Sequence, residues 1–137
     1  MKARLYSTLF FLLASVVISV CYAFQKKDNS NHWQAPAEAK NVINPYKGPA
    51  ATEKGKVLYQ KMCVVCHGNS GKGDGVGAVS LSTKPADHTA SYVQSISDGA
   101  LYWMITNGKS PMPGYKTSLT DEQRWQLVDY IRELGRK

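Results

Sequence analysis

The sequence has few cysteines and no internal repeat. Three cysteines among 137 residues are too few for a disulfide framework, and no internal repeat is visible. Acidic residues are also scarce, with 10 Asp and Glu against 17 Lys and Arg. The length suits one ordinary domain with some extra segments. These shortages exclude a large catalytic domain, a collagen or coiled-coil rod and a cysteine-rich toxin fold, so a short motif has to supply the function.

The longest hydrophobic run lies at the amino terminus. Lys2 and Arg4 precede residues 5–24, which contain no charge, and this is the pattern of a secretory signal. Three outcomes stay open for residues 1–24: cleavage after Ala23, lipidation of Cys21 as in a bacterial lipoprotein, or retention as a membrane anchor. We therefore expect the rest of the chain on the periplasmic side of a bacterial cell envelope. It would be tethered there through its N-terminus, or soluble if cleavage follows Ala23.

The remainder divides into a linker and a compact domain. Residues 25–51 are polar, hold three of the six prolines and show no sustained helical or strand period, so they are predicted to be a flexible linker. Residues 52–137 are predicted to form one domain, because the candidate ligands and packing residues all lie in this range. The linker is expected to take no part in the structure of the domain.

Three helices are predicted in the domain. The first begins with Thr52 as its cap, and the second runs between Ser97 and Gly108. The last begins at Thr120, which is predicted to form a capping box with Gln123. No segment alternates as a strand would, so the fold class is all-α. Apolar residues at helical spacing are Val57, Leu58 and Met62 in the first helix and Leu127, Tyr130, Ile131 and Leu134 in the last.

The motif that carries the chemistry is Cys63-Val64-Val65-Cys66-His67. The pattern C-x-x-C-H is typical of covalent c-type haem attachment. Two thiols three positions apart lie on one face of a helical turn and can reach two substituents of one flat macrocycle. His67 would then present a ring nitrogen to the iron as proximal ligand. A domain this small buries little apolar surface, and a haem would complete its core.

Zinc binding, thiol redox chemistry and a disulfide suit this motif less well than haem. A structural zinc site needs two further ligands, and the domain has no third cysteine; His88 alone does not complete the set. A thioredoxin-like redox pair requires a βαβ setting that the glycine-rich sequence after His67 does not provide. A disulfide between Cys63 and Cys66 is compatible with export but leaves the small core without its filler. Haem attachment is therefore favoured.

With these motifs, residues 52–137 resemble the class I monohaem cytochrome c family. The resemblance rests on residues 63–68, on the glycine-rich residues 71–75, on Pro111-Met112-Pro113 and on the C-terminal helix. It implies a small all-α fold in which helices wrap around one haem c, held by thioethers at Cys63 and Cys66.

The resemblance also assigns roles to individual residues. It implies that His67 is the proximal iron ligand and Met112 the distal one. It makes Pro85 the candidate whose carbonyl accepts the proton of the His67 ring and so fixes its orientation. It further implies that the first and last helices cross, with Gly55 and Tyr59 on the first helix and Leu127 and Tyr130 on the last.

The residues themselves also favour Met112 as distal ligand. It follows His67 by 45 residues and lies between two prolines, in a segment with fixed backbone and little helical tendency. Met62 lies too close to the attachment motif to reach the opposite face, and Met104 is expected to pack in the core of a helix. His88 is the rival ligand, although its polar neighbours are more typical of a surface position.

A Met/His-ligated haem predicts an electron carrier that does not itself turn over a substrate. Its partners would be redox proteins such as an oxidase, a reductase or a dehydrogenase. Alternative functions are a haem subunit or domain of a larger oxidoreductase, or a small-ligand sensor with a labile Met112. Binding to nucleic acid is not expected of an exported haem protein. A positive rim that could steer docking is predicted from Lys54, Lys56, Lys61, Lys72, Lys84, Lys109 and Lys116.

The first testable prediction concerns the two cysteines of the motif. Replacing Cys63 and Cys66 together by serine should abolish covalent haem and stable folding at once, because the small core has no other filler. Absorbance of the purified protein after denaturation and a thermal melt measure both effects. A well-folded, haem-free double variant with a cooperative melt would contradict the prediction.

Overall fold

The computed structural model describes residues 33–136. The chain divides into two units, residues 1–33 and 34–137, and the second unit contains the helical domain. The predicted export segment, with its candidate sites at Cys21 and Ala23, lies outside the described residues. Within residues 33–136 no helix combines the length and the apolar character needed to cross a membrane.

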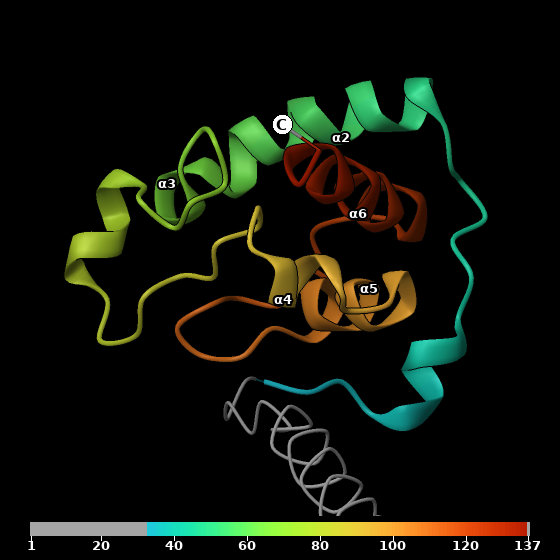
Figure 1. Ribbon diagram of the computed structural model, residues 1–137, viewed down its shortest axis with the longest axis horizontal. Helices are drawn as coiled ribbons and strands as arrows, with labels where there is room; N and C mark the ends of the chain where they lie inside the picture. Colours follow the sequence, from blue (N-terminus) through green and yellow to red (C-terminus); the bar gives the residue numbers. More distant parts are fainter. Residues whose placement is uncertain (1–32, 137) are drawn as a thin grey trace, which may run out of the picture. The chain divides into compact units, whose positions relative to one another are not determined.

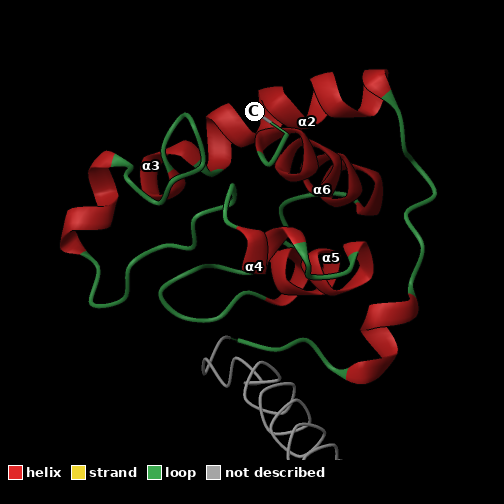
Figure 2. Cartoon of the chain, viewed as in Figure 1, coloured by secondary structure: helices red, strands yellow, loops and turns green. Residues whose placement is uncertain are grey.

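All regular elements in the described part of the chain are helical (Figures 1 and 2), which confirms the predicted fold class. Only one isolated bridge, between Lys109 and Met112, occurs outside the helices of residues 33–136. The elements are η1 (Ala37–Asn41), α2 (Pro49–Met62), α3 (Val64–His67), η2 (Val76–Ser80), α4 (Ser91–Gln94), α5 (Asp98–Asn107) and α6 (Asp121–Leu134).

The core is centred on the crossing of α2 and α6, the most extensive helix contact of the described residues (Figure 1). Gly55 permits this crossing, because a Cβ atom there would collide with the backbone carbonyl of Gln126. One turn later the fully buried Tyr59 packs on Tyr130, with ring centroids 5.1 Å apart. Leu127 is also fully buried. The predicted contact of Gly55 and Tyr59 with the last helix is confirmed.

The predicted starts of the two later helices are correct. Ser97 caps α5, with its hydroxyl oxygen accepting a hydrogen bond from the Ala100 N–H at 3.3 Å. Thr120 and Gln123 form the predicted capping box at the start of α6, with bonds of 2.9 and 3.2 Å. Such boxes satisfy two backbone donors that the first turn of a helix leaves unpaired.

The first long helix starts three residues before the predicted cap, Thr52. Gly48 precedes α2 with φ +133°, and Pro49 occupies the first helical position, where a missing N–H has no consequence. Thr52 lies inside the first turn, and its hydroxyl donates to the Gly48 carbonyl at 3.2 Å. Pro49 therefore begins a helix, although in the sequence the prolines of residues 25–51 indicate a linker.

The prediction of a flexible linker over residues 25–51 is wrong for residues 34–51. Helix η1 packs against α5, where a Cβ atom on Gly99 would collide with the Ala39 carbonyl. Asn44 is 5% exposed, and its amide donates to Asp129 of α6 at 2.8 Å. The segment therefore belongs to the domain, because small and polar side chains anchor it where no hydrophobic pattern marks the contact.

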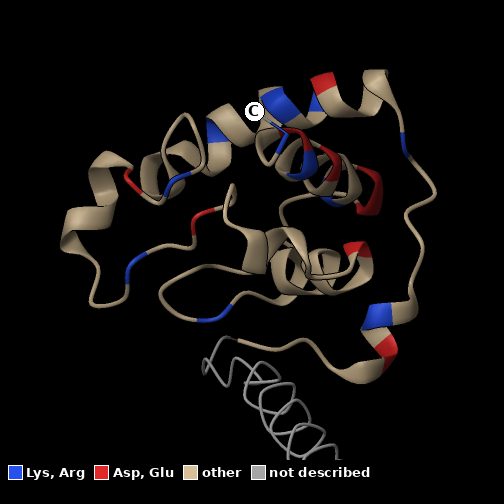
Figure 3. Cartoon of the chain, in the orientation of Figure 1, with Lys and Arg blue, Asp and Glu red and all other residues tan. Residues whose placement is uncertain are grey.

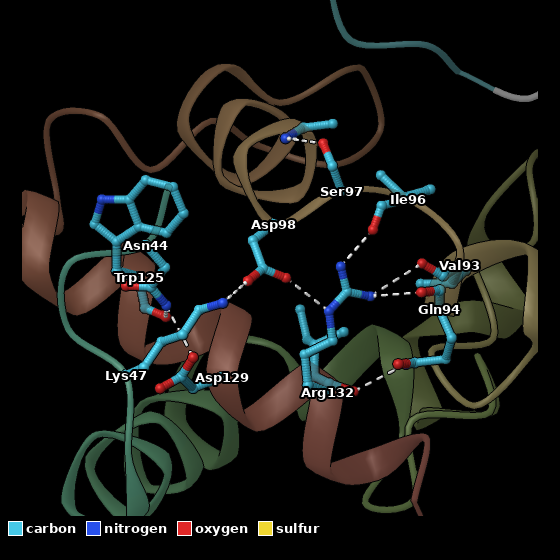
Figure 4. A network of polar contacts seen from close by, with 12 residues as sticks. Asn44, Lys47, Val93, Gln94, Ile96, Ser97, Asp98, Trp125, Asp129 and Arg132 are labelled. Carbon is cyan, nitrogen blue, oxygen red and sulfur yellow. Dashed lines mark hydrogen bonds and ion pairs between the residues drawn. The ribbon is translucent and has the colours of Figure 1, made fainter. Parts of the chain in front are cut away.

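A polar network also fastens this segment to the start of α5 (Figure 4). The Asp98 carboxylate accepts hydrogen bonds from Lys47 at 2.7 Å and from Arg132 of α6 at 2.9 Å. Burial raises the pKa of Asp98, but these two cations more than offset it and hold that pKa below its ordinary value. The Arg132 guanidinium also donates to carbonyls at the end of α4 and in the connection to α5, those of Val93, Gln94 and Ile96.

Loss of the Asn44 amide should therefore destabilise the domain more than loss of the Lys47 ammonium. Asn44→Ala should lower the free energy of unfolding by about 1–3 kcal/mol, because a buried carboxylate loses a donor. Lys47→Ala should lower it by less than about 1 kcal/mol, since that side chain is largely exposed. Denaturant titrations compare the two variants. Equal small effects would show that residues 34–48 contribute little to stability.

Candidate functional site

The predicted attachment motif forms the end of α2 and the short helix α3. The Cys63 N–H donates to the Tyr59 carbonyl at 2.9 Å, which ends α2. The Cys63 carbonyl accepts from the N–H groups of Cys66 and His67, at 3.1 and 2.9 Å. Both cysteines are half-buried free thiols, and burial, with Cys66 nearby, raises the pKa of Cys63 to about 12. A single turn thus presents two thiols and an imidazole.

A glycine-rich loop, residues 68–75, folds back over this turn. The Gly73 N–H donates to the His67 carbonyl at 2.9 Å, and the Gly75 N–H donates to the Cys66 carbonyl at 3.1 Å. These bonds satisfy carbonyls that the end of α3 leaves without helical partners. Gly73 has φ +71°, a conformation that favours glycine. The loop therefore holds the attachment turn in place through backbone contacts.

The His67 ring is oriented by a backbone carbonyl. Its Nδ1 lies 3.1 Å from the Ala86 oxygen, so Nδ1–H donates and Nε2 is left free to bind a metal ion. Burial lowers the pKa of His67, and the hydrogen bond to Ala86 offsets this only in part. The ring is therefore neutral at pH 7, the form that ligates metals.

The predicted acceptor, the carbonyl of Pro85, is wrong by one residue. That carbonyl faces Gly73, where a Cβ atom would collide with it. With the Pro85 carbonyl turned to Gly73, the carbonyl of Ala86 is the one that faces His67.

His88 is buried, although its polar neighbours predict a surface position. It is 9% exposed, and its ring stacks on that of His67 with centroids 4.1 Å apart and planes 20° from parallel. Its Nδ1 lies 3.1 Å from the Tyr59 hydroxyl. Burial first, and the nearby His67 second, lower the pKa of His88 to about 3. Two neutral imidazoles therefore lie face to face in the site.

This stacking argues against His88 as the distal ligand. With metal–nitrogen bonds of about 2.0–2.1 Å, two imidazoles on opposite faces of one ion would have centroids about 6 Å apart. Their coordinating nitrogens would also point toward each other. The rings of His67 and His88 instead stack face to face, with centroids only 4.1 Å apart.

Met112 lies half-buried in the loop between α5 and α6. Lys109 and Met112 exchange backbone hydrogen bonds of 3.0 and 2.9 Å across a tight turn. The loop is narrow at its base, because Gly108 has φ +65° and a Cβ atom there would collide with the backbone of Gly114. Met104, in contrast, is buried within α5, as predicted for core packing.

Tyr115 ties this loop to the attachment motif. Its N–H donates to the Ile105 carbonyl at 3.0 Å, and its hydroxyl donates to the Met62 carbonyl at 3.1 Å. Met62 directly precedes Cys63. The loop between α5 and α6 and helix α3 extend from the same side of the domain (Figure 1). The structure therefore brings together two segments that lie 53 residues apart.

Three supporting residues were missed or misplaced by sequence reasoning. Ala86 acts through its main-chain carbonyl, for which a side-chain pattern gives no signal. The available signal for His88 was Tyr59, since a tyrosine buried in a helix crossing needs a hydrogen-bond partner. Tyr115 follows the Pro-Met-Pro segment closely, and an aromatic residue there could have indicated a contact with the attachment motif.

Lysines lie on the loops that flank the site (Figure 3). Lys54 and Lys56 form exposed ion pairs of 3.9 Å with Glu122 and Glu53. Charges without a partner act over a longer range on an approaching protein. The other lysines of the predicted rim form no ion pair with another described residue: Lys61, Lys72, Lys84, Lys109 and Lys116.

Exposed apolar side chains lie beside the attachment motif. Val76 and Val79 of η2 are 84% and 88% exposed, and Val65 of α3 is 55% exposed. Helices α3 and η2 pack on each other, and a Cβ atom on Gly77 would lie 3.2 Å from the Val65 side chain. Exposed apolar groups gathered in this way are typical of surfaces that contact another molecule.

Comparison with known proteins identifies the family. Residues 50–131, more than half of the chain, match the family "Cytochrome C oxidase, cbb3-type, subunit III". The chain belongs to this family. Its compact part is a class I c-type cytochrome domain, as the sequence resemblance implied. This membership also accounts for the all-α fold around a C-x-x-C-H turn.

Two curated relatives are cbb3-type cytochrome c oxidase subunits CcoP. The chain is 31% identical over 87 residues to that of Azospirillum brasilense, which covers 63% of this chain and 29% of the relative. It is 32% identical over 89 residues to that of Azospirillum sp. (strain B510), which covers 60% and 28%. The chain thus spans less than a third of the length of either relative.

A solved structure resembles the domain as well. It is a chain of the Kuenenia stuttgartiensis reducing HAO-like protein complex Kustc0457/Kustc0458, with a TM-score of 0.62 and 29% sequence identity. The match covers 67% of this chain and 47% of that one. This likeness supports the fold, and the matched chain belongs to a protein complex.

The described residues fit the haem c that this family implies. Cys63 and Cys66 are free thiols on one turn, and the Nδ1 of His67 is engaged by Ala86 so that Nε2 remains for iron. Within residues 33–136 no group of three or more His, Cys, Asp or Glu side chains could hold a metal ion instead. The donor set is therefore that of a haem c and differs from that of a zinc site.

The narrow base of the Met112 loop leads to a prediction. Gly108→Ala introduces a Cβ atom that collides with the returning chain, so it should displace the loop and weaken the iron ligation that the sequence predicts for Met112. The measurement is the weak red absorbance band that ferric haem shows with a methionine ligand. Gly48→Ala is the control, since Gly48 also has a positive φ but open space around it. A Gly108→Ala variant that keeps the band would contradict the prediction.

Proposed function

We propose that this domain carries single electrons as the haem subunit or domain of a larger oxidoreductase, with one haem c joined to Cys63 and Cys66. The attachment turn is the main support, with two free thiols and a His67 imidazole whose Nδ1 is engaged by Ala86. Relatives described as oxidase subunits support the larger assembly. One-electron oxidation and reduction of iron is the chemistry that a bound haem c supplies.

The residues of the attachment turn hold and orient the group. Cys63 and Cys66 anchor it through thioethers, and Nε2 of His67 is the proximal ligand. The hydrogen bond from Nδ1–H to the Ala86 carbonyl selects the required tautomer and raises the basicity of Nε2. The glycine-rich loop keeps the turn from moving, because it bonds the carbonyls of Cys66 and His67.

Met112 is the proposed distal ligand. Its loop is fixed at Gly108 and tied by Tyr115 to the residue before the attachment motif. The rival residues have other positions, since Met104 is buried in α5 and His88 stacks on His67. A thioether ligand favours ferrous iron and raises the reduction potential, and a filled sixth position excludes small ligands. These properties suit electron transfer and do not suit ligand sensing.

The proposed partners are redox proteins of the bacterial cell envelope. The rim lysines that lack ion pairs favour an acidic docking face. The exposed Val65, Val76 and Val79 add apolar contact area next to the attachment turn. We further propose that residues 1–24 direct the chain to the periplasmic side and tether it to the membrane unless they are removed.

The assignment of Met112 is tested by replacing it. Met112→Ala should abolish the low-spin spectrum and lower the reduction potential by on the order of 0.1 V, part of the roughly 0.8 V range that axial ligands span. Met112→His should also lower the potential but keep the iron low-spin. Potentiometric titrations with recorded spectra measure both properties.

Met104→Leu serves as the matched control for these variants. It exchanges one buried methionine for a side chain of similar volume and should cost less than about 1.5 kcal/mol of stability with an unchanged spectrum. The assignment fails if Met104→Leu or a His88 variant loses the low-spin signal while Met112→Ala retains it. Reversible binding of carbon monoxide by the unaltered protein would favour the sensor alternative.

A further inference from the structure

His88 makes a contact that the proposed electron-transfer function does not require. Its ring lies face to face with that of His67, with centroids 4.1 Å apart, although neither the resemblance nor the motif assigns it a role. A histidine this deeply buried has to be hydrogen-bonded to be tolerated. The Tyr59 hydroxyl supplies that bond at 3.1 Å, so the two residues form a built pair.

The position of His88 is restrained on all sides. Its N–H donates to the Gly71 carbonyl at 2.6 Å, and its carbonyl accepts from the Gln94 amide, which also donates to Ile131 of α6. Gly71 leaves no space beside it, since a Cβ atom there would lie 3.1 Å from the Cβ of His88. Tyr59, which holds the ring itself, is fully buried in the α2–α6 crossing. The ring therefore cannot swing without disturbing the core.

A single hydrogen bond leaves an axial imidazole some rotational freedom. A ring bound through Nε2 can turn about the metal–nitrogen axis, and the bond from Nδ1–H to Ala86 restrains that turn only within the wide angular tolerance of hydrogen bonds. A flat ring stacked 20° from parallel opposes the same rotation by steric contact. The Ala86 carbonyl and the His88 ring thus both restrain rotation of the His67 ring about the metal–nitrogen axis.

We propose that His88, held by Tyr59, is a positioning residue that sets the plane of the His67 imidazole relative to the haem. This rests on the proposed role of His67 as proximal ligand. The orientation of the axial imidazole plane determines how unpaired spin is distributed over a ferric low-spin haem. It therefore determines the order and spread of the haem methyl resonances in the proton NMR spectrum and the principal g values in electron paramagnetic resonance.

The test compares four variants of the ferric haem-loaded protein by both spectroscopies. His88→Leu keeps an apolar side chain of similar bulk but removes the flat ring, so the methyl resonances should change in order or spread. Tyr59→Phe removes only the hydroxyl that holds His88 and should shift them in the same direction by a smaller amount. The double variant Tyr59→Phe/His88→Phe keeps both rings without a buried unpaired polar group and should restore the original pattern.

Tyr102→Phe is the matched control, because it removes a tyrosine hydroxyl that bonds Asp121 and Arg124. It should leave both spectra unchanged. The proposal is overturned if His88→Leu keeps the original methyl pattern, or if the ring-preserving double variant changes it as much as His88→Leu does. If His88→Leu does not fold, the proposal is overturned when Tyr59→Phe keeps the original methyl pattern, or when the double variant changes it as much as Tyr59→Phe does.

Failure of the proposed function would look different. If His67 were not the proximal ligand, the unaltered protein itself would lack a histidine-ligated low-spin spectrum. If His67 is the ligand and His88 only fills space, the unaltered protein shows that spectrum and the His88→Leu variant shares its methyl pattern.

Discussion

The close crossing of α2 and α6 determines where the remaining parts of the domain lie. The backbones meet at Gly55, because that position has no side chain to hold them apart. Gly55 and Tyr59 lie four residues apart on one face of α2, and Cys63, the residue directly after α2, follows Tyr59 by another four. The contact with α6, the support of the His88 ring and the first thiol therefore occupy successive turns. A shift at the crossing would be transmitted to the attachment motif.

Backbone groups form most of the remaining scaffold of the site. The glycine-rich loop is held by the carbonyls of α3, the His67 ring by that of Ala86, and Tyr115 by that of Met62. Backbone acceptors are fixed by the fold and have no rotamers to lose, so they hold a ligand set without further ordering entropy. A ligand set held in this way suits electron transfer, because its geometry changes little when the iron changes oxidation state.

The sequence predicted what is encoded locally. The starts of α5 and α6 are given by Ser97 and Thr120, whose capping bonds lie within three residues. The docking of residues 34–48 depends on contacts more than 50 residues away, such as that of Asn44 with Asp129, which no local pattern reveals. His88 was misjudged for the same reason, since its polar neighbours are local and its partner Tyr59 is distant. Main-chain acceptors such as Ala86 leave no trace in side-chain chemistry.

The docked segment 34–48 has a consequence for where electrons can go. A 27-residue linker between residues 24 and 52 could extend to about 95 Å, whereas the chain between residues 24 and 34 spans at most about 35 Å. Because Asn44 and Lys47 are bonded to the rest of the domain, residues 34–48 do not extend as part of a tether. For a chain anchored by its first 24 residues, the start of the domain would stay within about 35 Å of the anchor. If the proposed anchoring by residues 1–24 holds, such a domain would exchange electrons with proteins of its own membrane.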